Sequence, residues 1–310
     1  MGTELKKPYL RKRIGYFWGR QGVVLGLKLA ELLSIRDLNR LASLVGRIGY
    51  FLGGKYRRIV DNNLHMAFGT SKTDKEYSAI AKIVYQNMVS NIFEIAKFFH
   101  AEPDLVNEMV SVNGLEHLET ALSKGKGVVA VSAHLGNFSL IGPRLTREGY
   151  PFSLVLRDAK DEMLAKILRD LRSNVGIESI PVNPRRTCIA KSLACLKRNG
   201  ILFLQIDQNA SSQDVWVDFF GWQVPTFKGP VVLSMRTGAQ VVPMFIIRDR
   251  SGHHQLIIRP PYSLEKTDNH EDDIFCNTTS LTKLIEGYIE QYPAQWWWFH
   301  RRWKKARRAN

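Results

Sequence analysis

The sequence predicts an α/β fold with a largely parallel sheet, flanking helices and an α-helical N-terminal region that associates with a membrane. Continuous apolar runs, typical of strands buried on both faces, begin near residue 127 and recur at 152–156, 201–206, 241–247 and 255–259. Between them lie helical stretches at 161–174, 187–198 and 230–237. Because strands that alternate with helices need crossover connections, neighbouring strands are expected to run parallel.

The N-terminal third is helical in pattern. Residues 15–54 predict two helices, and the second carries an apolar stripe with steps of three and four: Leu38, Leu41, Val45, Ile48 and Leu52. This stripe either packs on the body of the protein or also dips into a bilayer surface. Residues 75–100 predict a further helix with one core-facing side. We therefore expect a membrane-associating helical region at 1–100 and an α/β body at 101–310, joined as one continuous domain.

The charge of the chain is strongly basic. Lys and Arg total 44 against 29 Asp and Glu, which gives a formal charge of +15. Such a field attracts polyanions: nucleic acid, anionic lipid headgroups or an acidic partner protein. The odd cysteine count of 3 argues against a disulfide scaffold and favours a reducing, cytoplasmic side. We see no secretory signal, and the apolar runs are shorter than the roughly 18 residues of a membrane span.

The C-terminal segment "PAQWWWFHRRWKKARRAN" combines tryptophans with basic residues. This combination suits a membrane interface, where indoles lie at headgroup depth. It also suits single-stranded nucleic acid, where aromatic rings stack on bases. A third interpretation is a final helix whose tryptophans, Trp296 and Trp303 among them, fill the core.

Several common catalytic motifs are absent. The chain has neither a G-x-S-x-G elbow nor a Walker loop. The spacing in "GKGVVA" (125–130) matches a dinucleotide site, but its glycines precede the strand, whereas such a site needs them after it. His253 and His254 occur in "RDRSGHHQ", which we interpret as a solvated hairpin, and no metal site is expected.

Chemistry-bearing residues follow three of the predicted strands. His134 follows the first strand, Arg157 follows the next, and Asp207 and Gln208 follow a third. Open α/β sheets bind their ligands at the carboxyl ends of parallel strands. If these strands are neighbours, a base, a cation and an acid converge, and that set suits acyl transfer.

Longer blocks of the sequence resemble a known family. The blocks "SAHLGNFSLIG", "LVLRD", "LQIDQNASSQDVWVDFFGWQVPTFKGPVVLSMRTGAQVVPMF" and "YPAQWWWFHRRWK" occur in the order and spacing of the bacterial late acyltransferases of lipid A assembly. These are lauroyl and myristoyl acyltransferases of the lysophospholipid acyltransferase superfamily. The wider group includes the acyltransferases of mannosylated phosphatidylinositol. "RRIVDNNLHMAFG" is similar to the N-terminal block of the family, so the resemblance covers nearly the whole chain.

The resemblance implies a reaction and a location. The family transfers a fatty acyl chain from acyl carrier protein or coenzyme A to a hydroxyl of a glycolipid such as a lipid A precursor. It does so at the cytoplasmic face of the inner membrane. The implied partners are acyl carrier protein, the glycolipid and the membrane surface, with no nucleic acid. No metal or redox cofactor is implied, and acyl-ACP or acyl-CoA serves as cosubstrate.

One position departs from the active-site motif of the family, which is a histidine, four residues, then Asp or Glu. His134 matches the histidine and Asn137 an internal asparagine, but Ser139 stands at the acid position. Three outcomes are open. Another carboxylate, first Asp207 and otherwise Asp214 or Asp218, supplies the charge. Alternatively the enzyme is slower or uses Ser139 with water, or the chain is a catalytically silent lipid-binding or assembly protein.

The resemblance also implies substrate contacts. Arg157 matches a basic position that contacts the substrate region, so we expect His134, Asp207 and Arg157 to form the catalytic set. We further expect substrate contacts from Asn137, Ser139, Gln208, Thr226 and Lys228. Of these, Thr226 and Lys228 are expected to reach headgroup phosphates. A nucleic-acid binder remains a distant alternative that rests only on charge and the Trp-Arg tail.

Overall fold

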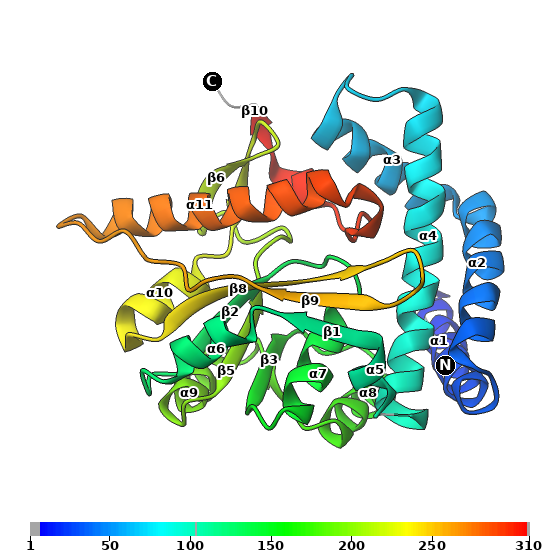
Figure 1. Cartoon of the computed structure of the whole chain (residues 1–310). Helices are drawn as coiled ribbons and strands as arrows, with labels where there is room; N and C mark the ends of the chain where they lie inside the picture. The colour runs from blue at the N-terminus through cyan, green and yellow to red at the C-terminus, as the bar shows by residue number, and fades with distance from the viewer. Residues whose placement is uncertain (1–6, 103, 309–310) are drawn as a thin grey trace, which may run out of the picture.

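The computed structural model describes residues 7–102 and 104–308 and is built around a seven-stranded sheet (Figure 1). The strand order is β1-β9-β8-β2-β5-β3-β4. The run from β8 to β4 is parallel throughout, whereas β9 is antiparallel to β8 and β1 is parallel to β9. The predicted α/β class with a largely parallel sheet is therefore confirmed. The strands are β1 (Val110–Asn113), β2 (Val128–Ser132), β3 (Phe152–Leu156), β4 (Ile177–Pro181), β5 (Ile201–Gln205), β8 (Gln240–Arg248) and β9 (His254–Ile258).

Helices cover both faces of this sheet. Along β2, Val128 and Ala130 face one core, while Val129 and Val131 face the other. Helices α6, α7 and α8 contribute to the first core, and α9, α10 and α11 to the second. Figure 1 shows α11 above the sheet and α7 and α8 below it. The helices between Leu105 and Gln291 are α5 (Leu105–Met109), α6 (Leu115–Leu122), α7 (Ile141–Arg147), α8 (Glu162–Asn174), α9 (Arg185–Lys197), α10 (Gly229–Thr237) and α11 (His270–Gln291).

The N-terminal helices stand together at one side of the sheet, as Figure 1 shows. They are α1 (Lys7–Leu32), α2 (Ile35–Leu52), α3 (Gly54–Phe68) and α4 (Asp74–Ala96). Ser34 caps α2, and Thr73 forms a capping box with Glu76 at the start of α4, so both helices begin where their first backbone N–H groups find acceptors. A short π-helical turn, η1 (Lys97–Ala101), ends α4.

The apolar stripe of α2 is mostly exposed. Leu38 is buried, but Val45, Ile48 and Leu52 are 41%, 49% and 81% exposed. The buried face of α2 instead follows steps of four through Leu38, Ala42, Gly46 and Tyr50, with the two small residues at its centre. Helix α2 therefore has two apolar faces. One packs on α4, and the other is exposed to solvent. No helix in the described ranges is both long and apolar enough to cross a membrane.

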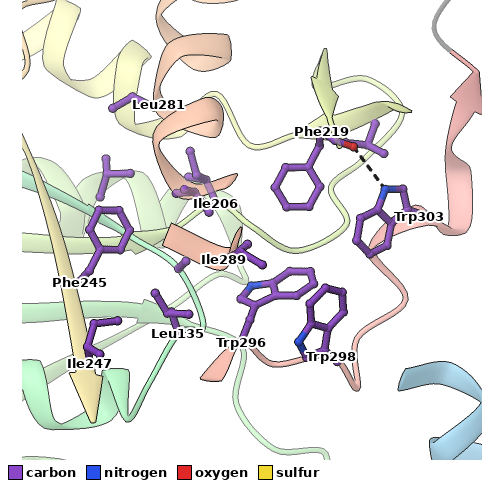
Figure 2. Close-up of a cluster of buried hydrophobic side chains, with 14 of the residues drawn as sticks. Leu135, Ile206, Phe219, Phe245, Ile247, Leu281, Ile289, Trp296, Trp298 and Trp303 are labelled. Carbon is purple, nitrogen blue, oxygen red and sulfur yellow. Dashed lines mark hydrogen bonds between the residues drawn. The ribbon is translucent and has the colours of Figure 1, made fainter. Parts of the chain in front are cut away.

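The C-terminal tryptophans fill the core without forming the final helix that we considered. Figure 2 shows Trp296, Trp298 and Trp303 packed together beside Phe219. Up to residue 308, the segment forms the short 3-10 turns η3 (Pro293–Gln295) and η4 (Arg302–Lys305) and then strand β10 (Arg307–Arg308). Strand β10 pairs with β7 (Trp222–Thr226), which pairs with β6 (Val215–Phe219), in a small antiparallel sheet.

Several elements lack a clear sequence signal and were not predicted. They are α3, β1, α6, α7, β4, the β6–β7 hairpin and α11. Strand β4 lies at an edge of the sheet. Its sequence, IESIP, is interrupted by polar residues such as Glu178, so it contains no continuous apolar run. Helix α11 buries polar residues, among them Asn277 and Thr282, which blur its apolar face.

The close contact of α2 with α4 gives a stability prediction. A Cβ added at Gly46 would lie 2.5 Å from Cα of Gln86, so Gly46→Ala must push the two helices apart. We expect urea denaturation to show a loss of about 1–3 kcal/mol in the free energy of unfolding. The control Gly22→Ala, in α1 with open space around the added atom, should be neutral or stabilising by up to about 1 kcal/mol. Equal effects of the two substitutions would contradict this packing.

Candidate active site

The sheet order brings His134 and Asp207 together. Strands β2 and β5 are neighbours, and Ser132 pairs with Gln205 at their carboxyl ends. Two residues further on, His134 Nδ1 lies 2.8 Å from Asp207 Oδ1. The backbone N–H of His134 also donates to Asp207 Oδ2 at 2.8 Å. The carboxylate thus holds both the ring and the backbone of the histidine.

Asp207 is an ionised acid inside the protein. Its side chain is fully buried, whereas that of His134 is 20% exposed. Trp296 Nε1 donates a third hydrogen bond, 2.7 Å long, to Asp207 Oδ2. Burial by itself would raise the pKa of Asp207, but the adjacent imidazole of His134 and these hydrogen bonds together hold it below its usual value. An ionised Asp207 fixes the proton of His134 on Nδ1 and leaves Nε2 as the basic nitrogen.

The other two carboxylates considered for this role lie elsewhere. Asp214 accepts a hydrogen bond from the backbone of Ser211 at 3.1 Å. Asp218 pairs with Lys283 at 2.6 Å. Ser139 lies half-buried in the 3-10 turn η2 (Phe138–Leu140), which follows the histidine loop. Asp207 is therefore the acid that the fold places on His134.

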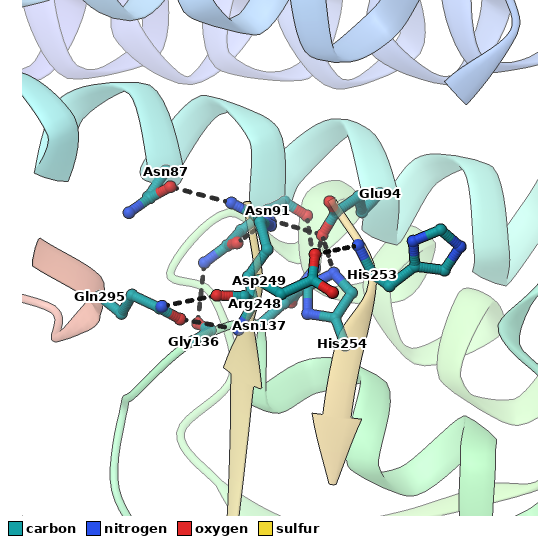
Figure 3. A network of polar contacts seen from close by, with 10 residues as sticks. All are labelled: Asn87, Asn91, Glu94, Gly136, Asn137, Arg248, Asp249, His253, His254 and Gln295. Atoms are coloured by element: carbon teal, nitrogen blue, oxygen red, sulfur yellow. Dashed lines mark hydrogen bonds and ion pairs between the residues drawn. The ribbon is translucent and has the colours of Figure 1, made fainter. Parts of the chain in front are cut away.

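A polar network holds the loop that carries His134 (Figure 3). Asn91 Nδ2 donates to the carbonyl of Gly136 at 2.9 Å, and the Gly136 N–H donates to the carbonyl of Gln295 at 3.0 Å. Gly136 has φ +59°, and a Cβ there would lie 2.0 Å from the carbonyl oxygen of Ile246, so only glycine fits. Asn137 donates to Glu94 Oε2 at 2.8 Å. We expected Asn137 at the substrate, but it is 1% exposed and acts inside the protein.

Glu94 is the centre of this network. It is fully buried on α4, with Arg248 Nη2 at 2.6 Å and His254 Nε2 at 3.1 Å. Burial disfavours its charge, yet Arg248, His254 and Asn137 together lower the pKa of Glu94 to about 2. The solvated hairpin predicted for both histidines is wrong for His254, because His254 begins β9 and faces Glu94. His253 does lie in the turn, next to Ser251.

Arg248 extends the network to the C-terminal segment. Its guanidinium donates to Asn87 Oδ1 at 3.0 Å and to Asn91 Oδ1 at 2.6 Å, both on α4. Its backbone N–H donates to Gln295 Oε1, and Gln295 Nε2 donates back to its carbonyl. Helix α4, strand β8 and turn η3 are thereby joined around the histidine loop.

The remaining predicted site residues differ in how far they are exposed to solvent. Arg157 is exposed directly after β3, which is separated from β2 by β5 alone. Gln208 and Lys228 are half-buried, the latter at the start of α10. Thr226, expected at a phosphate, is instead fully buried, and its hydroxyl accepts a hydrogen bond from Arg302 Nη2 at 2.5 Å. Thr226 is thus enclosed by the protein.

Arg302 is a structural residue that the sequence did not reveal. Its buried guanidinium also donates to the carbonyls of Gln208 at 2.8 Å and Pro225 at 2.6 Å. Burial lowers its pKa to about 10, which leaves it charged at neutral pH. It fastens the segment after Asp207 to the β6–β7 hairpin. In the sequence, Arg302 is one of many basic residues near the C-terminus, so nothing marks it as buried. Glu94 differs, because an acid inside the apolar stretch "NIFEIA" is a recognisable sign of a buried charge.

Within the described residues, no group of three or more His, Cys, Asp or Glu side chains is arranged to hold a metal ion. At this edge of the sheet, His134 Nδ1 and the buried carboxylate of Asp207 form an oriented imidazole–carboxylate pair. Such a pair can take a proton from a hydroxyl that reaches Nε2 and can return it to a leaving group.

The depressed pKa of Glu94 predicts a pH-dependent stability. A lowered pKa in the folded state stabilises the fold above the ordinary value of 4.5, and this contribution disappears as the pH falls toward about 2. We expect Glu94→Gln to cost about 3 kcal/mol in urea denaturation at pH 7, because it leaves Arg248 without its buried counter-charge. That difference from the wild type should shrink as the pH falls through this window.

An exposed substitution on α11 supplies the comparison. Glu290→Gln should change the free energy of unfolding by less than about 0.5 kcal/mol at pH 7. If the cost of Glu94→Gln is the same at the acid end of the window as at pH 7, the carboxylate of Glu94 does not supply this stability.

Comparison with known proteins identifies the family. Residues 6–305 match the family model described as "Bacterial lipid A biosynthesis acyltransferase". The phosphatidylinositol mannoside acyltransferase of Mycolicibacterium smegmatis is 27% identical over 64% of this chain and 64% of its own. The chain thus spans less than two thirds of the length of that relative. A lipid A biosynthesis acyltransferase of Haemophilus influenzae is 22% identical over 91% of this chain and 86% of its own.

A further relative is the lipid A biosynthesis palmitoleoyltransferase of Escherichia coli, which is 24% identical over 97% of this chain and 95% of its own. The family match includes the His134 loop, Asp207 and the tryptophans that pack beside them. The chain belongs to the bacterial lipid A biosynthesis acyltransferase family.

Proposed function

We propose that this protein is an O-acyltransferase that moves a fatty acyl chain from an acyl thioester to a hydroxyl of a glycolipid. The observation that carries the proposal is the pair of His134 and the buried Asp207 at the carboxyl edge of the sheet. Family membership supports it, as do relatives named as lipid A and phosphatidylinositol mannoside acyltransferases. A lipid A precursor or a related glycolipid is the acceptor, and acyl carrier protein or coenzyme A carries the donor chain.

The pair supports a direct transfer. His134 Nε2 takes the proton from the acceptor hydroxyl while its oxygen attacks the thioester carbonyl carbon. The resulting tetrahedral intermediate collapses, and the C–S bond breaks. The proton on Nε2 passes to the departing thiolate, so the products are an ester and a free thiol. Asp207 stabilises the imidazolium that exists between these two proton transfers.

Arg157 is the proposed cation of the reaction. It is exposed at the same edge of the sheet as His134, about 10 Å away across two strand spacings. A guanidinium there can bind an anionic group of the substrate or the developing oxyanion. Gln208, Lys228 and Ser139 are half-buried around this edge and remain proposed substrate contacts.

A catalytically silent role is less well supported. It rested on the missing acid at Ser139, and Asp207 supplies a carboxylate on the imidazole from a neighbouring strand. A basic surface also suits an acidic carrier protein, which we propose as the donor partner.

We further propose that the protein works on a membrane surface, at the cytoplasmic face of the inner membrane. Its N-terminal helices expose large apolar side chains to solvent: Phe17, Trp18, Leu25, Leu44, Val45, Ile48, Phe51 and Leu52. Arg40 and Arg47 are exposed on the same helix α2, where they can meet anionic headgroups. Such helices lie in the interface and bring the acceptor lipid to the site.

The role of Asp207 can be tested by turnover. Asp207→Asn preserves shape but removes the charge that stabilises the imidazolium, so we expect kcat to fall by about two decades or more. His134→Ala should abolish transfer. The assay is transfer of labelled acyl chain from acyl carrier protein to a detergent-dispersed glycolipid.

The matched controls are the carboxylates that do not touch His134. Asp214→Asn and Asp218→Asn should stay within about threefold of wild-type kcat. Because Asp207 already fills the acid role, Ser139→Glu should lower the rate or leave it unchanged. A rise of about a decade with Ser139→Glu would show that Ser139 is a catalytic deficit.

The membrane role predicts a loss of vesicle binding. Val45→Asp/Ile48→Asp places two carboxylates on the exposed apolar face of α2, and sedimentation with anionic phospholipid vesicles should weaken by at least about tenfold. Phe275→Asp, exposed on α11, is the control and should bind nearly as the wild type does. Equal binding by all three proteins would place the membrane contact elsewhere.

A further inference from the structure

A cavity outside the His134 site lies between α3 and the C-terminal segment. Its volume is about 920 Å³, within the usual range of small-molecule sites. One wall is the side of α3 from Gly54 to Met66, and the other is formed by residues around η4. Nothing in the proposed acyl-transfer mechanism uses this cavity.

The lining of the cavity is basic. Its charged side chains are Lys55, Arg58, Arg301 and Lys304, all of them exposed. No Asp or Glu lines it, and none of the four makes an ion pair with a carboxylate of residues 7–102 or 104–308. Unneutralised cations that converge on a concave site favour an anionic ligand, and Arg in particular favours phosphate.

The cavity also has an apolar part. Ile59, Met66 and Trp303 line it beside the cations, and Asn62 and Asn63 add amides. A site for a free anion needs no such surface. A ligand with a phosphate and an attached hydrocarbon matches the whole lining, because the phosphate can meet the cations and the hydrocarbon can meet the apolar side chains.

Two packed tryptophans connect the wall of the cavity to the His134 site. Trp303 lines the cavity and packs on Trp296, with ring centroids 6.0 Å apart, and Trp296 donates to Asp207. Asn63 donates to the carbonyls of Trp298 and His300, each at 2.7 Å. A ligand held here therefore lies next to the segment that supports the catalytic acid.

We propose that this cavity binds a phosphate ester of a lipid headgroup, with the attached hydrocarbon against Ile59, Met66 and Trp303. The proposal deepens the proposed function, on which it rests, by adding a second anchoring point beside the reaction site. The phosphate has two possible sources with the same chemistry. It belongs either to the glycolipid acceptor or to the surrounding membrane phospholipid. A carrier-protein surface is less favoured, because a recess of this size suits a headgroup better than the broad face of a protein contact.

The test uses a soluble probe and two charge-matched variants. Dihexanoyl phosphatidic acid, kept below its micelle concentration, is titrated calorimetrically into the full-length protein. Arg58→Glu/Arg301→Glu should raise the Kd by at least about tenfold. Lys124→Glu/Arg236→Glu makes the same change in net charge at the amino ends of β2 and β8 and should stay within about twofold. Dihexanoylglycerol, which lacks the phosphate, should not bind measurably.

Two measurements distinguish the sources of the phosphate: KM for the acceptor and binding to phospholipid vesicles. If Arg58→Glu/Arg301→Glu raises KM for a phosphorylated acceptor about tenfold, with kcat unchanged and no effect on its dephosphorylated form, the acceptor supplies the phosphate. If it leaves KM unchanged but weakens binding to phosphatidylglycerol vesicles, the membrane supplies it. Either result supports the site.

The proposal is overturned if the probe does not bind, or if both double variants weaken it equally, since the effect would then be net charge alone. Loss of carrier-protein affinity without any probe binding would overturn it in favour of a protein contact. Probe binding needs no turnover, so His134→Ala should bind the probe as the wild type does. The site and the proposed reaction can therefore fail separately.

Discussion

The buried carboxylate of Asp207 is the interaction on which the site depends. A charge enclosed in protein is tolerated only where donors compensate for the lost water. Those donors come from the backbone and ring of His134 and from the indole of Trp296. The loop after β2 and the C-terminal segment must both be in place before Asp207 is satisfied. Orienting the imidazole and completing the core are consequently one structural event.

In the proposed reaction, this arrangement accounts for a serine at the acid position of the motif. The acid needs to contact Nδ1 and to be shielded from water, but it does not need to follow the histidine in sequence. Asp207 meets both conditions from the adjacent strand, because β2 and β5 end side by side. Ser139, in the turn η2, is free of that role. The position of the negative charge is thus set by sheet order, which local sequence spacing does not reveal.

The sequence predicted what depends on local pattern and missed what depends on distant contacts. Parallel strands such as β2 and β5 contain continuous apolar runs, so their positions and the edge that carries His134 and Asp207 could be predicted. Asn137 and Thr226 were assigned to substrate because they lie in the blocks that resemble the family. Their partners, Glu94 and Arg302, lie 43 and 76 residues away in the chain, and only folding brings them together.

Helix α4 contacts both the proposed membrane-binding helix α2 and the loop that carries His134. On one side it meets α2 so closely that Gly46 has no room for a Cβ beside Gln86. On another it extends Asn91 and Glu94 to the histidine loop. A long helix is stiff, and both contacts are made without flexible linkers between them. One element, α4, therefore fixes the orientation of the His134 loop relative to the exposed apolar face of α2.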